Sequence, residues 1–436
     1  MDFKKEIKLK DLLPKRGSKT STDVPVSEDK QAKSKRNRSF ARKAKAEAEA
    51  QGEHLAEQPS EKKQKKQKKH KTQKPSKKLT GAKSNQHKRL VGLKVGASQL
   101  AAARVVNNGS AELVQVARQA LDPGIIVGGE LREPEALVEA LKLFFNDNKL
   151  PKQAVRLGIA SNRIGVRTFD IGGITDPKQL ENAIRFRAQE TLPIPLEEAV
   201  LDYQILGESV DEEGAQTHRV LLVVAYRDLV DRYVAACKKA GIKLVGIDLE
   251  AFALLRALGD RPADAGNAAI VVVSVGSERS TLAVSNGETC EFTRVIEWGG
   301  HNLNVVIARA LDMTPVEAEP IKLSVSLLEP AESMDLDPER AAKVRTAVAA
   351  ELQLFARELV SSLQFYQGQP GSLGIAEVVL TGGSAQLPGL DVELGRMLGV
   401  KVRVGDPLSR VTLGKKVGSD IEAGSLAIAI GLGIEA

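Results

Sequence analysis

Three glycine turns contain the residues of this sequence that are best suited to holding a ligand. They are Val95-Gly96-Ala97-Ser98, Val275-Gly276-Ser277 and Thr381-Gly382-Gly383-Ser384. Glycine has no Cβ, so the backbone can turn sharply and approach a ligand closely at these points. Successive backbone N–H groups in such turns converge and attract an anion. The turns predict a nucleotide-binding site, and the alternative is a set of tight turns that hold no ligand.

The elements that must position these turns form a pattern that occurs twice. An apolar strand leads into the glycine turn, and two further strands follow, joined by an Asn-Gly turn of the kind that closes hairpins. Val95-Gly96 matches Val275-Gly276, and Asn108-Gly109 matches Asn286-Gly287, about 180 residues apart. This internal repeat predicts a duplicated fold, whereas two unrelated hairpins are the alternative.

The remaining elements alternate between helices and strands, which is typical of an α/β fold. A long amphipathic helix is predicted near residues 341–366, because its apolar residues recur every three or four positions. Leu387-Pro388-Gly389-Leu390 is predicted to open another helix, with Pro388 near its first turn. Other helices are expected over 134–148, 176–191 and 228–240, and strands over 154–160, 164–169, 200–206, 220–226, 242–247 and 400–404.

The charge of the chain is divided between a basic tail and an acidic body. Residues 1–90 carry 28 lysines and arginines against 11 acidic residues, while residues 91–436 carry a net charge of −10. Residues 1–88 have few large apolar side chains, so they are predicted to be disordered. The basic run 62–78 is either a solvated spacer or a contact for anionic lipid headgroups. Nucleic-acid binding is disfavoured, since no aromatic residue interrupts the run to stack on bases.

A short apolar cluster precedes the basic run. Ile7, Leu9, Leu12, Leu13 and Pro14 stand among charged residues within 7–14. Such a cluster in an otherwise polar arm is typical of a docking peptide. A chance cluster is the alternative.

Cysteine usage and hydropathy indicate a cytoplasmic protein. Cys237 and Cys290 are isolated in apolar surroundings, which predicts two buried thiols and no disulfide framework. The first residues lack the apolar core of a signal peptide. The longest apolar run, 423–434, is too short to span a bilayer, which needs roughly 20 residues.

The order of the three turns resembles that of the actin–sugar kinase–heat-shock ATPase superfamily. Within it, four segments are similar to landmarks of the type IV pilus assembly protein PilM family: 190–204, 248–255, 297–303 and 380–390. The resemblance covers about residues 90–436. It implies an actin-like α/β fold with two ribonuclease H-type halves and a small α+β domain of the FtsA type inserted in the first half.

That resemblance implies the following domain limits. After the tail 1–88, the first half covers 89–166, the insert 167–246, the end of the first half and a linker 247–267, and the second half 268–436.

The resemblance also implies a function and a set of site residues. It implies a cytoplasmic scaffold at the inner face of the membrane that binds a short N-terminal peptide of a PilN-like inner-membrane protein, and self-association is one further expectation. ATP is the implied cofactor, with no metal and no catalytic residue assigned. The implied nucleotide-binding residues are Lys94, Gly96, Ala97, Ser98, Ser274, Gly276, Ser277, Gly299, Gly300, Gly382, Gly383 and Ser384.

Three positions depart from the family pattern. Lys94 and Ser274 stand where the family has an aspartate before each phosphate-binding turn, and Ala101 stands where it has a lysine. Mg²⁺ prefers carboxylate and phosphate oxygens, so weak or absent hydrolysis is expected. Lys94 either contacts phosphate in place of the metal, giving nucleotide binding without Mg²⁺, or pairs with a carboxylate in an abandoned site. The rival reading is an ATP-dependent enzyme such as a small-molecule kinase.

Residues 12–14 also resemble the Asn-Leu-Leu-Pro type of peptide with which PilN docks. Residues 7–14 are therefore a candidate docking peptide within this chain itself. Its target is the chain's own groove, a neighbour's groove or another partner.

Overall fold

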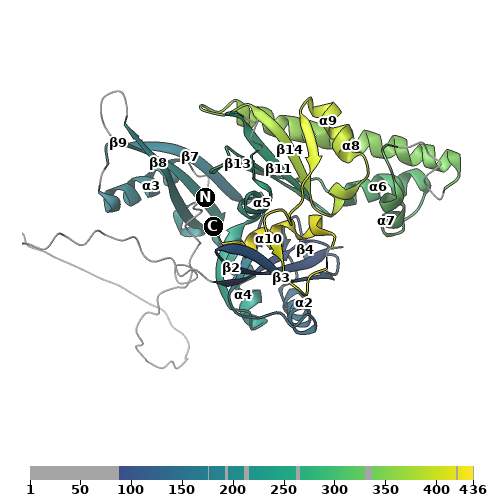
Figure 1. Cartoon of the computed structure of the whole chain (residues 1–436), viewed down its shortest axis with the longest axis horizontal. Coiled ribbons are helices and arrows are strands. Elements are labelled where there is room, and N and C mark those ends of the chain that lie inside the picture. The colour runs from purple at the N-terminus through teal and green to yellow at the C-terminus, as the bar shows by residue number, and fades with distance from the viewer. Residues whose placement is uncertain are drawn as a thin grey trace, which may run out of the picture. The chain divides into compact units, whose positions relative to one another are not determined.

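The computed structural model of this chain describes residues 88–174, 176–191, 195–210, 216–261, 266–328, 336–418 and 421–435 (Figure 1). All of them belong to one of the two units into which the chain divides. The predicted disordered tail and the docking segment 7–14 lie outside the described residues.

The first half is built on a mixed sheet whose first three strands form an antiparallel meander. Its strand order is β10-β6-β1-β2-β3-β16. β6 runs parallel to β1, and β10 runs parallel to β6. The strands are β1 Arg89–Val95, β2 Gln99–Asn108, β3 Ser110–Ala120, β6 Val155–Ile159, β10 Leu244–Leu249 and β16 Thr412–Leu413.

The second half repeats this arrangement, with the order β13-β12-β11-β14-β15. β11, β12 and β13 form an antiparallel meander, and β14 and then β15 add in parallel. Both sheets thus share the order third, second, first, fourth and fifth strand, which confirms the predicted duplication. The strands are β11 Ala269–Val275, β12 Ser280–Ser285, β13 Cys290–Ile296, β14 Ile375–Thr381 and β15 Lys401–Val404.

Helices cover the outer face of each sheet. In the first half, α2 and α4 pack on the face that carries Leu100 and Ala102 of β2. In the second half, α6, α8 and α9 pack on the face that carries Val271 and Val273 of β11. The outer helices are α2 Pro134–Asp147, α4 Arg227–Lys239, α6 Gly300–Leu311, α7 Pro315–Ser324, α8 Pro338–Gln367 and α9 Leu390–Leu398.

Two helices form a layer between the sheets (Figure 1). α5 (Glu250–Leu258) and α10 (Ala427–Gly433) share a core with Ile270 and Val272, on the inner face of β11. α10 also packs on Ala101 and Ala103, on the inner face of β2. Because side chains alternate across a strand, each sheet has one face for its outer helices and one for this layer.

The long helix α8 follows its predicted pattern closely. The apolar residues at three- and four-residue steps, such as Val344, Leu352 and Phe355, are all buried against the second sheet. Asp337 caps the helix through its side chain, which accepts a hydrogen bond from the Arg340 N–H at 3.0 Å.

The start of α9 differs from the prediction. α9 begins at Leu390, after Gly389 with a φ of 84°. Pro388 thus lies near the first turn, but two residues before the helix begins. A 3₁₀ turn, Gly383–Gln386, begins at the second glycine of the pair, and the left-handed Gly389 redirects the chain into the helix.

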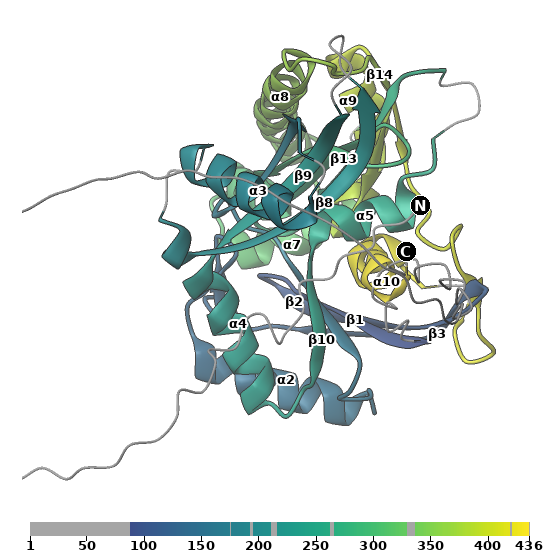
Figure 2. The same ribbon diagram turned by 90° about the vertical axis from the view of Figure 1, so that its left-hand side faces the viewer.

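A third, three-stranded sheet lies beside the first half, in the order β7-β9-β8. α3 packs across it through Leu180 and Ile184 (Figure 2). These elements are β7 Ile164–Gly172, α3 Pro177–Thr191, a short 3₁₀ turn Leu196–Glu198, β8 Ala199–Val210 and β9 Gln216–Tyr226.

The chain leaves this third sheet earlier than the insert boundaries 167–246 suggest. α4 contributes Leu229 and Tyr233 to the core of the first half, and β10 belongs to the first sheet. The extent of a separately folding insert stays a prediction.

The end of the chain returns to the first half, which the limits 268–436 for the second half do not anticipate. β16 pairs with β3 in parallel, and a 3₁₀ turn, Ala423–Leu426, leads into α10.

Among the helices that the structure describes, none has the length and hydrophobicity needed to cross a membrane.

Candidate functional site

The first two glycine turns have the same geometry in the two halves. The Gly96 N–H donates to the Gln99 carbonyl at 3.0 Å, and the Gly276 N–H donates to the Arg279 carbonyl at 3.0 Å. Each turn connects the central strand of its sheet, β1 or β11, to the next strand of the meander. The repeat seen in the sequence is therefore also a repeat of the turn conformation.

The second turn meets the start of α6. The Gly300 N–H donates to the Gly276 carbonyl at 2.9 Å, and the His301 N–H donates to the Ser277 carbonyl at 2.8 Å. A Cβ on Gly299 would overlap the Ser277 carbonyl. Glycine is thus required at 299 by the close approach of two backbone segments.

The third turn joins the same cluster. The Ser384 hydroxyl donates to the Gly276 carbonyl at 3.3 Å, and a Cβ on Gly300 would overlap the Ser384 Oγ atom. The structure therefore brings together three separate segments of the sequence, represented by Ser277, Gly299-Gly300 and Ser384.

Gly382 has the most constrained backbone of the third turn. Its φ is 96°, and a Cβ there would overlap the Val275 carbonyl. Its N–H donates to the Gly424 carbonyl at 3.1 Å, and the Thr381 hydroxyl donates to the same oxygen at 3.2 Å. The glycine pair is thus held by the segment that leads into α10.

Lys94 lies at the first turn and has a carboxylate partner. Its Nζ atom is 3.8 Å from Glu250 Oε2, with side-chain exposures of 18% and 9%. Its Cε atom lies 3.9 Å from the position that a Cβ on Gly96 would occupy. The ammonium group thus lies next to the turn and is paired with Glu250, the first residue of α5. This position is compatible with both alternatives for Lys94, which are contact with a phosphate and pairing with a carboxylate.

Ser274, the equivalent residue in the second half, is 4% exposed and lies opposite Thr281 in the sheet. Within the described residues, no group of three or more His, Cys, Asp or Glu side chains could hold a metal ion. The donors near these turns are backbone N–H groups and a lysine ammonium. Such donors can attract an anion such as phosphate.

Arg279, which was not among the predicted site residues, adds a second cation. It stands at the end of the β11–β12 turn, and a Cβ on Gly129 would overlap its guanidinium. Gly129 lies in the first half, between the short strands β4 (Ile126–Val127) and β5 (Glu130–Leu131). The Arg279 Nη1 atom is buried without a hydrogen-bond partner among the described residues. An arginine three residues after Gly276 was the available sequence signal.

The contact of Arg279 belongs to a wider connection between the halves. The Gly128 N–H donates to Glu278 Oε2 at 3.2 Å, and the Tyr233 hydroxyl donates to the Gly129 carbonyl at 3.2 Å. Burial raises the pKa of Tyr233 well above its usual range, which keeps this hydroxyl protonated as a donor. The second glycine turn is thereby held against the first half.

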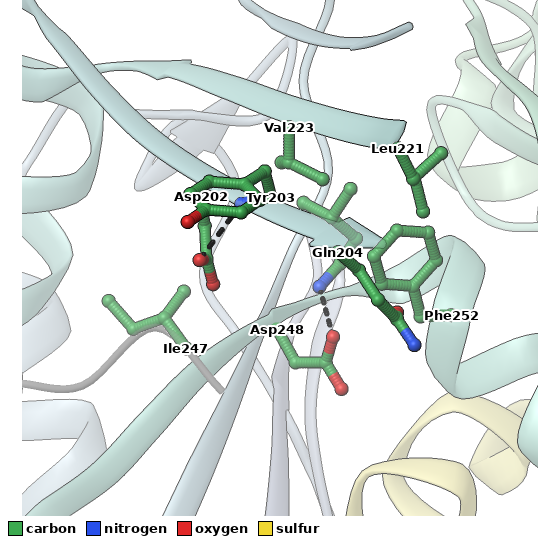
Figure 3. A pocket seen from close by; sticks show the side chains of 9 residues that line it. Asp202, Tyr203, Gln204, Leu221, Val223, Ile247, Asp248 and Phe252 are labelled. Carbon is green, nitrogen blue, oxygen red and sulfur yellow. Dashed lines mark hydrogen bonds between the residues drawn. The ribbon is translucent and has the colours of Figure 1, made fainter. Parts of the chain in front are cut away.

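A separate groove lies between the third sheet and the first sheet (Figure 3). It is a small hollow of about 40 Å³ that is partly open to solvent. β8 and β10, the outer strands of their sheets, form its two sides. Its lining residues are Asp202, Tyr203 and Gln204 of β8, Leu221 and Val223 of β9, Ile247, Asp248 and Leu249 of β10, and Phe252 of α5.

Most of the groove surface is apolar, with carboxylates at its sides. The Asp202 carboxylate accepts a hydrogen bond from the Tyr203 N–H at 2.9 Å. Asp248 accepts one from the Leu249 N–H at 2.8 Å and pairs with the buried Arg256. Burial raises the pKa of the Tyr203 hydroxyl. The segments 190–204 and 248–255, noted separately in the sequence, thus meet across one groove.

Comparisons with known proteins agree with this architecture. A family model for the type IV pilus assembly protein PilM matches residues 92–436. The cell division protein FtsA of Escherichia coli (strain K12) is 25% identical over 367 residues, which cover 75% of this chain and 86% of that protein. A solved structure of a PilM–PilN type IV pilus biogenesis complex aligns with a TM-score of 0.67 and 25% identity, over 79% of this chain and 97% of that chain. The chain therefore belongs to the PilM family of actin-like type IV pilus assembly proteins.

Proposed function

We propose that this protein is a cytoplasmic scaffold of a type IV pilus assembly machine that binds a short N-terminal peptide of a PilN-type inner-membrane protein. The observation that carries the proposal is the apolar groove between β8 and β10. Membership in the PilM family and the similarity to a PilM–PilN complex support it.

The chemistry of the groove suits an extended apolar peptide. Leu221, Val223 and Phe252 offer apolar surface for alternate side chains of such a peptide. The two sides are strands, so a peptide lying between them in an extended conformation follows both. Burying its apolar side chains releases about 25 cal/mol per Å² of surface removed from water.

The test is a binding measurement with the first residues of the PilN protein from the same organism, as a fluorescent peptide. We expect saturable binding to the full chain by fluorescence anisotropy, and a loss of affinity of at least about tenfold in Phe252→Ala, because an aromatic contact is removed. Phe186→Ala is the matched control, since Phe186 is 63% exposed on α3 and away from the groove. Equal affinities of the two variants would contradict the assignment of the groove.

We further propose that the glycine turns bind a nucleoside triphosphate without requiring Mg²⁺, and that hydrolysis is very weak. The backbone donors of the turns, together with Lys94 and Arg279, place positive potential where family members have carboxylates. A protein cation can neutralise phosphate charge directly, and Glu250, the carboxylate beside the first turn, is already paired with Lys94.

The fluorescence of Trp298, the only tryptophan of the chain, can report nucleotide binding. It directly precedes Gly299 and is stacked on Phe355 at 4.0 Å between ring centroids. Titration with ATP, excited at wavelengths where ATP does not absorb, is expected to change its emission with similar affinity in EDTA and in Mg²⁺. Binding that needs Mg²⁺ and is followed by turnover would instead favour the kinase-like alternative.

A further inference from the structure

We propose that residues 7–14 of this same chain occupy the β8–β10 groove and compete there with the partner peptide. The inference rests on the proposed function of the groove and adds a regulator to it. The segment then acts as an internal competitor that a partner must displace.

The side-chain pattern of the segment matches the groove. In an extended chain, Ile7 and Leu9 project to one face and Lys8 and Lys10 to the other. The apolar face can lie on Leu221 and its neighbours while the lysines remain in solvent. Leu13 lies on the same face as Ile7 and Leu9, together with Asp11, whereas Leu12 lies on the face of the lysines. Pro14 has no N–H and ends the extended pairing.

Charge complementarity favours the same arrangement. Residues 7–16 carry Lys8, Lys10, Lys15 and Arg16 against the single acidic residue Asp11. The body, residues 91–436, carries a net charge of −10. Asp202 and Asp248 lie on the two sides of the groove, and Asp248 pairs with Arg256. The attraction comes from the overall negative charge of the body.

The connection between the segment and the body makes binding within one chain efficient. About 70 residues separate Pro14 from Lys88, and a coil of that length has an average span of about 50 Å. Such a tether gives an effective concentration on the order of millimolar or somewhat below. A segment with even micromolar intrinsic affinity would therefore fill most of the grooves.

The test measures how freely the groove of the full chain accepts a probe, a fluorescent peptide with the sequence of residues 1–16. The double variant Leu12→Asp/Leu13→Asp should bind this probe at least about tenfold more tightly than the unmodified chain, because its own segment no longer competes. Val24→Asp/Val26→Asp makes the same chemical change outside the segment and should behave as the unmodified chain. Adding Phe252→Ala to the first double variant should abolish the gain.

The outcomes separate this inference from the proposed function. Equal probe binding by the unmodified chain and by Leu12→Asp/Leu13→Asp, or no probe binding by either, overturns self-docking. If the PilN peptide still binds in that case, the proposed function is retained and only self-docking is rejected. If the probe binds as expected and the PilN peptide does not, self-docking stands and the proposed partner is wrong.

Discussion

Lys94 and Glu250 carry opposite charges beside the first glycine turn, so each must affect an anion bound there with the opposite sign. The pair is mostly buried, with 3.8 Å between Nζ and Oε2. Near a protein surface, charges at such distances interact by a few kcal/mol at most. The residues can therefore be tested separately without rebuilding the site.

We predict that Lys94→Met weakens ATP binding by at least about tenfold, while Glu250→Gln strengthens it several-fold. The lysine attracts phosphate, whereas the carboxylate repels it and competes for the lysine. Trp298 fluorescence in EDTA measures both affinities. The exposed Lys142, paired with Glu139 on α2, supplies the control Lys142→Met, for which no change is expected. Weaker binding in Glu250→Gln would show that the lysine does not contact the phosphates.

Alanine substitutions at Gly382 and Gly109 distinguish the energetic cost of steric overlap from the cost of a strained backbone conformation. Both have a positive φ, but a Cβ on Gly109 has nothing within 4 Å, whereas one on Gly382 would overlap the Val275 backbone. We predict that Gly109→Ala lowers the free energy of unfolding by about 1 kcal/mol and Gly382→Ala by more than about 3 kcal/mol. Urea unfolding measures both, and similar losses in the two variants would contradict the geometry of the third turn.

At the scale of elements, the end of α10 is held by arginine side chains in addition to its own capping residue Ile434, whose N–H donates to the Ile430 carbonyl at 3.1 Å. The Arg156 Nη1 atom donates to the carbonyls of Leu432 and Ile434 at 2.9 and 3.0 Å. The Arg256 Nε atom donates to the Gly431 carbonyl at 2.8 Å. The last carbonyls of a helix have no partner within the helix, so these arginines satisfy them in the interior.

We predict that Arg156→Met lowers the free energy of unfolding by about 2–4 kcal/mol, since carbonyls would remain buried without their donor. Arg309→Met on α6 is the control, because Arg309 is exposed, and a change within about 0.5 kcal/mol is expected for it. Chemical denaturation of both variants checks the difference. A loss as small as that of the control would mean that solvent reaches these carbonyls.

At the scale of the whole molecule, the layer formed by α5 and α10 is shared by both halves. A Cβ on Gly431 of α10 would overlap the Ala253 carbonyl of α5, and one on Gly92 of β1 would overlap the Ala429 carbonyl of α10. α10 packs on the inner faces of both β11 and β2, so unfolding of either half would expose its apolar side chains. The two halves should therefore unfold together.

Two probes test this prediction. Cys237 lies in the core of the first half and Trp298 in that of the second. Burial raises the pKa of Cys237 and of Cys290 to about 12, so native thiols should not react with a disulfide reagent at pH 8. In Cys290→Ala, urea midpoints from Cys237 labelling and from Trp298 fluorescence should coincide. Separate midpoints would show that the halves are independent folding units.

Several features were predicted correctly because their signals are local. The repeated strand–turn pattern around Gly96 and Gly276 predicted two equivalent sheets, and both have the same strand order. Apolar residues at three- and four-residue steps predicted α8, and these residues are buried in the second core. The two cysteines were expected to be buried thiols, and both are.

Other features depend on which distant segments meet. The pairing of Lys94 with Glu250, the contact of Arg279 with Gly129 and the return of β16 to β3 each join segments more than 100 residues apart. The groove between β8 and β10 likewise arises only when two sheets lie side by side. The sequence by itself determined the repeat, the glycine turns and the amphipathic helices, because periodicity and turn chemistry act over a few residues. Only the tertiary structure decided the ion pairs and the groove, because long-range packing selects these partners.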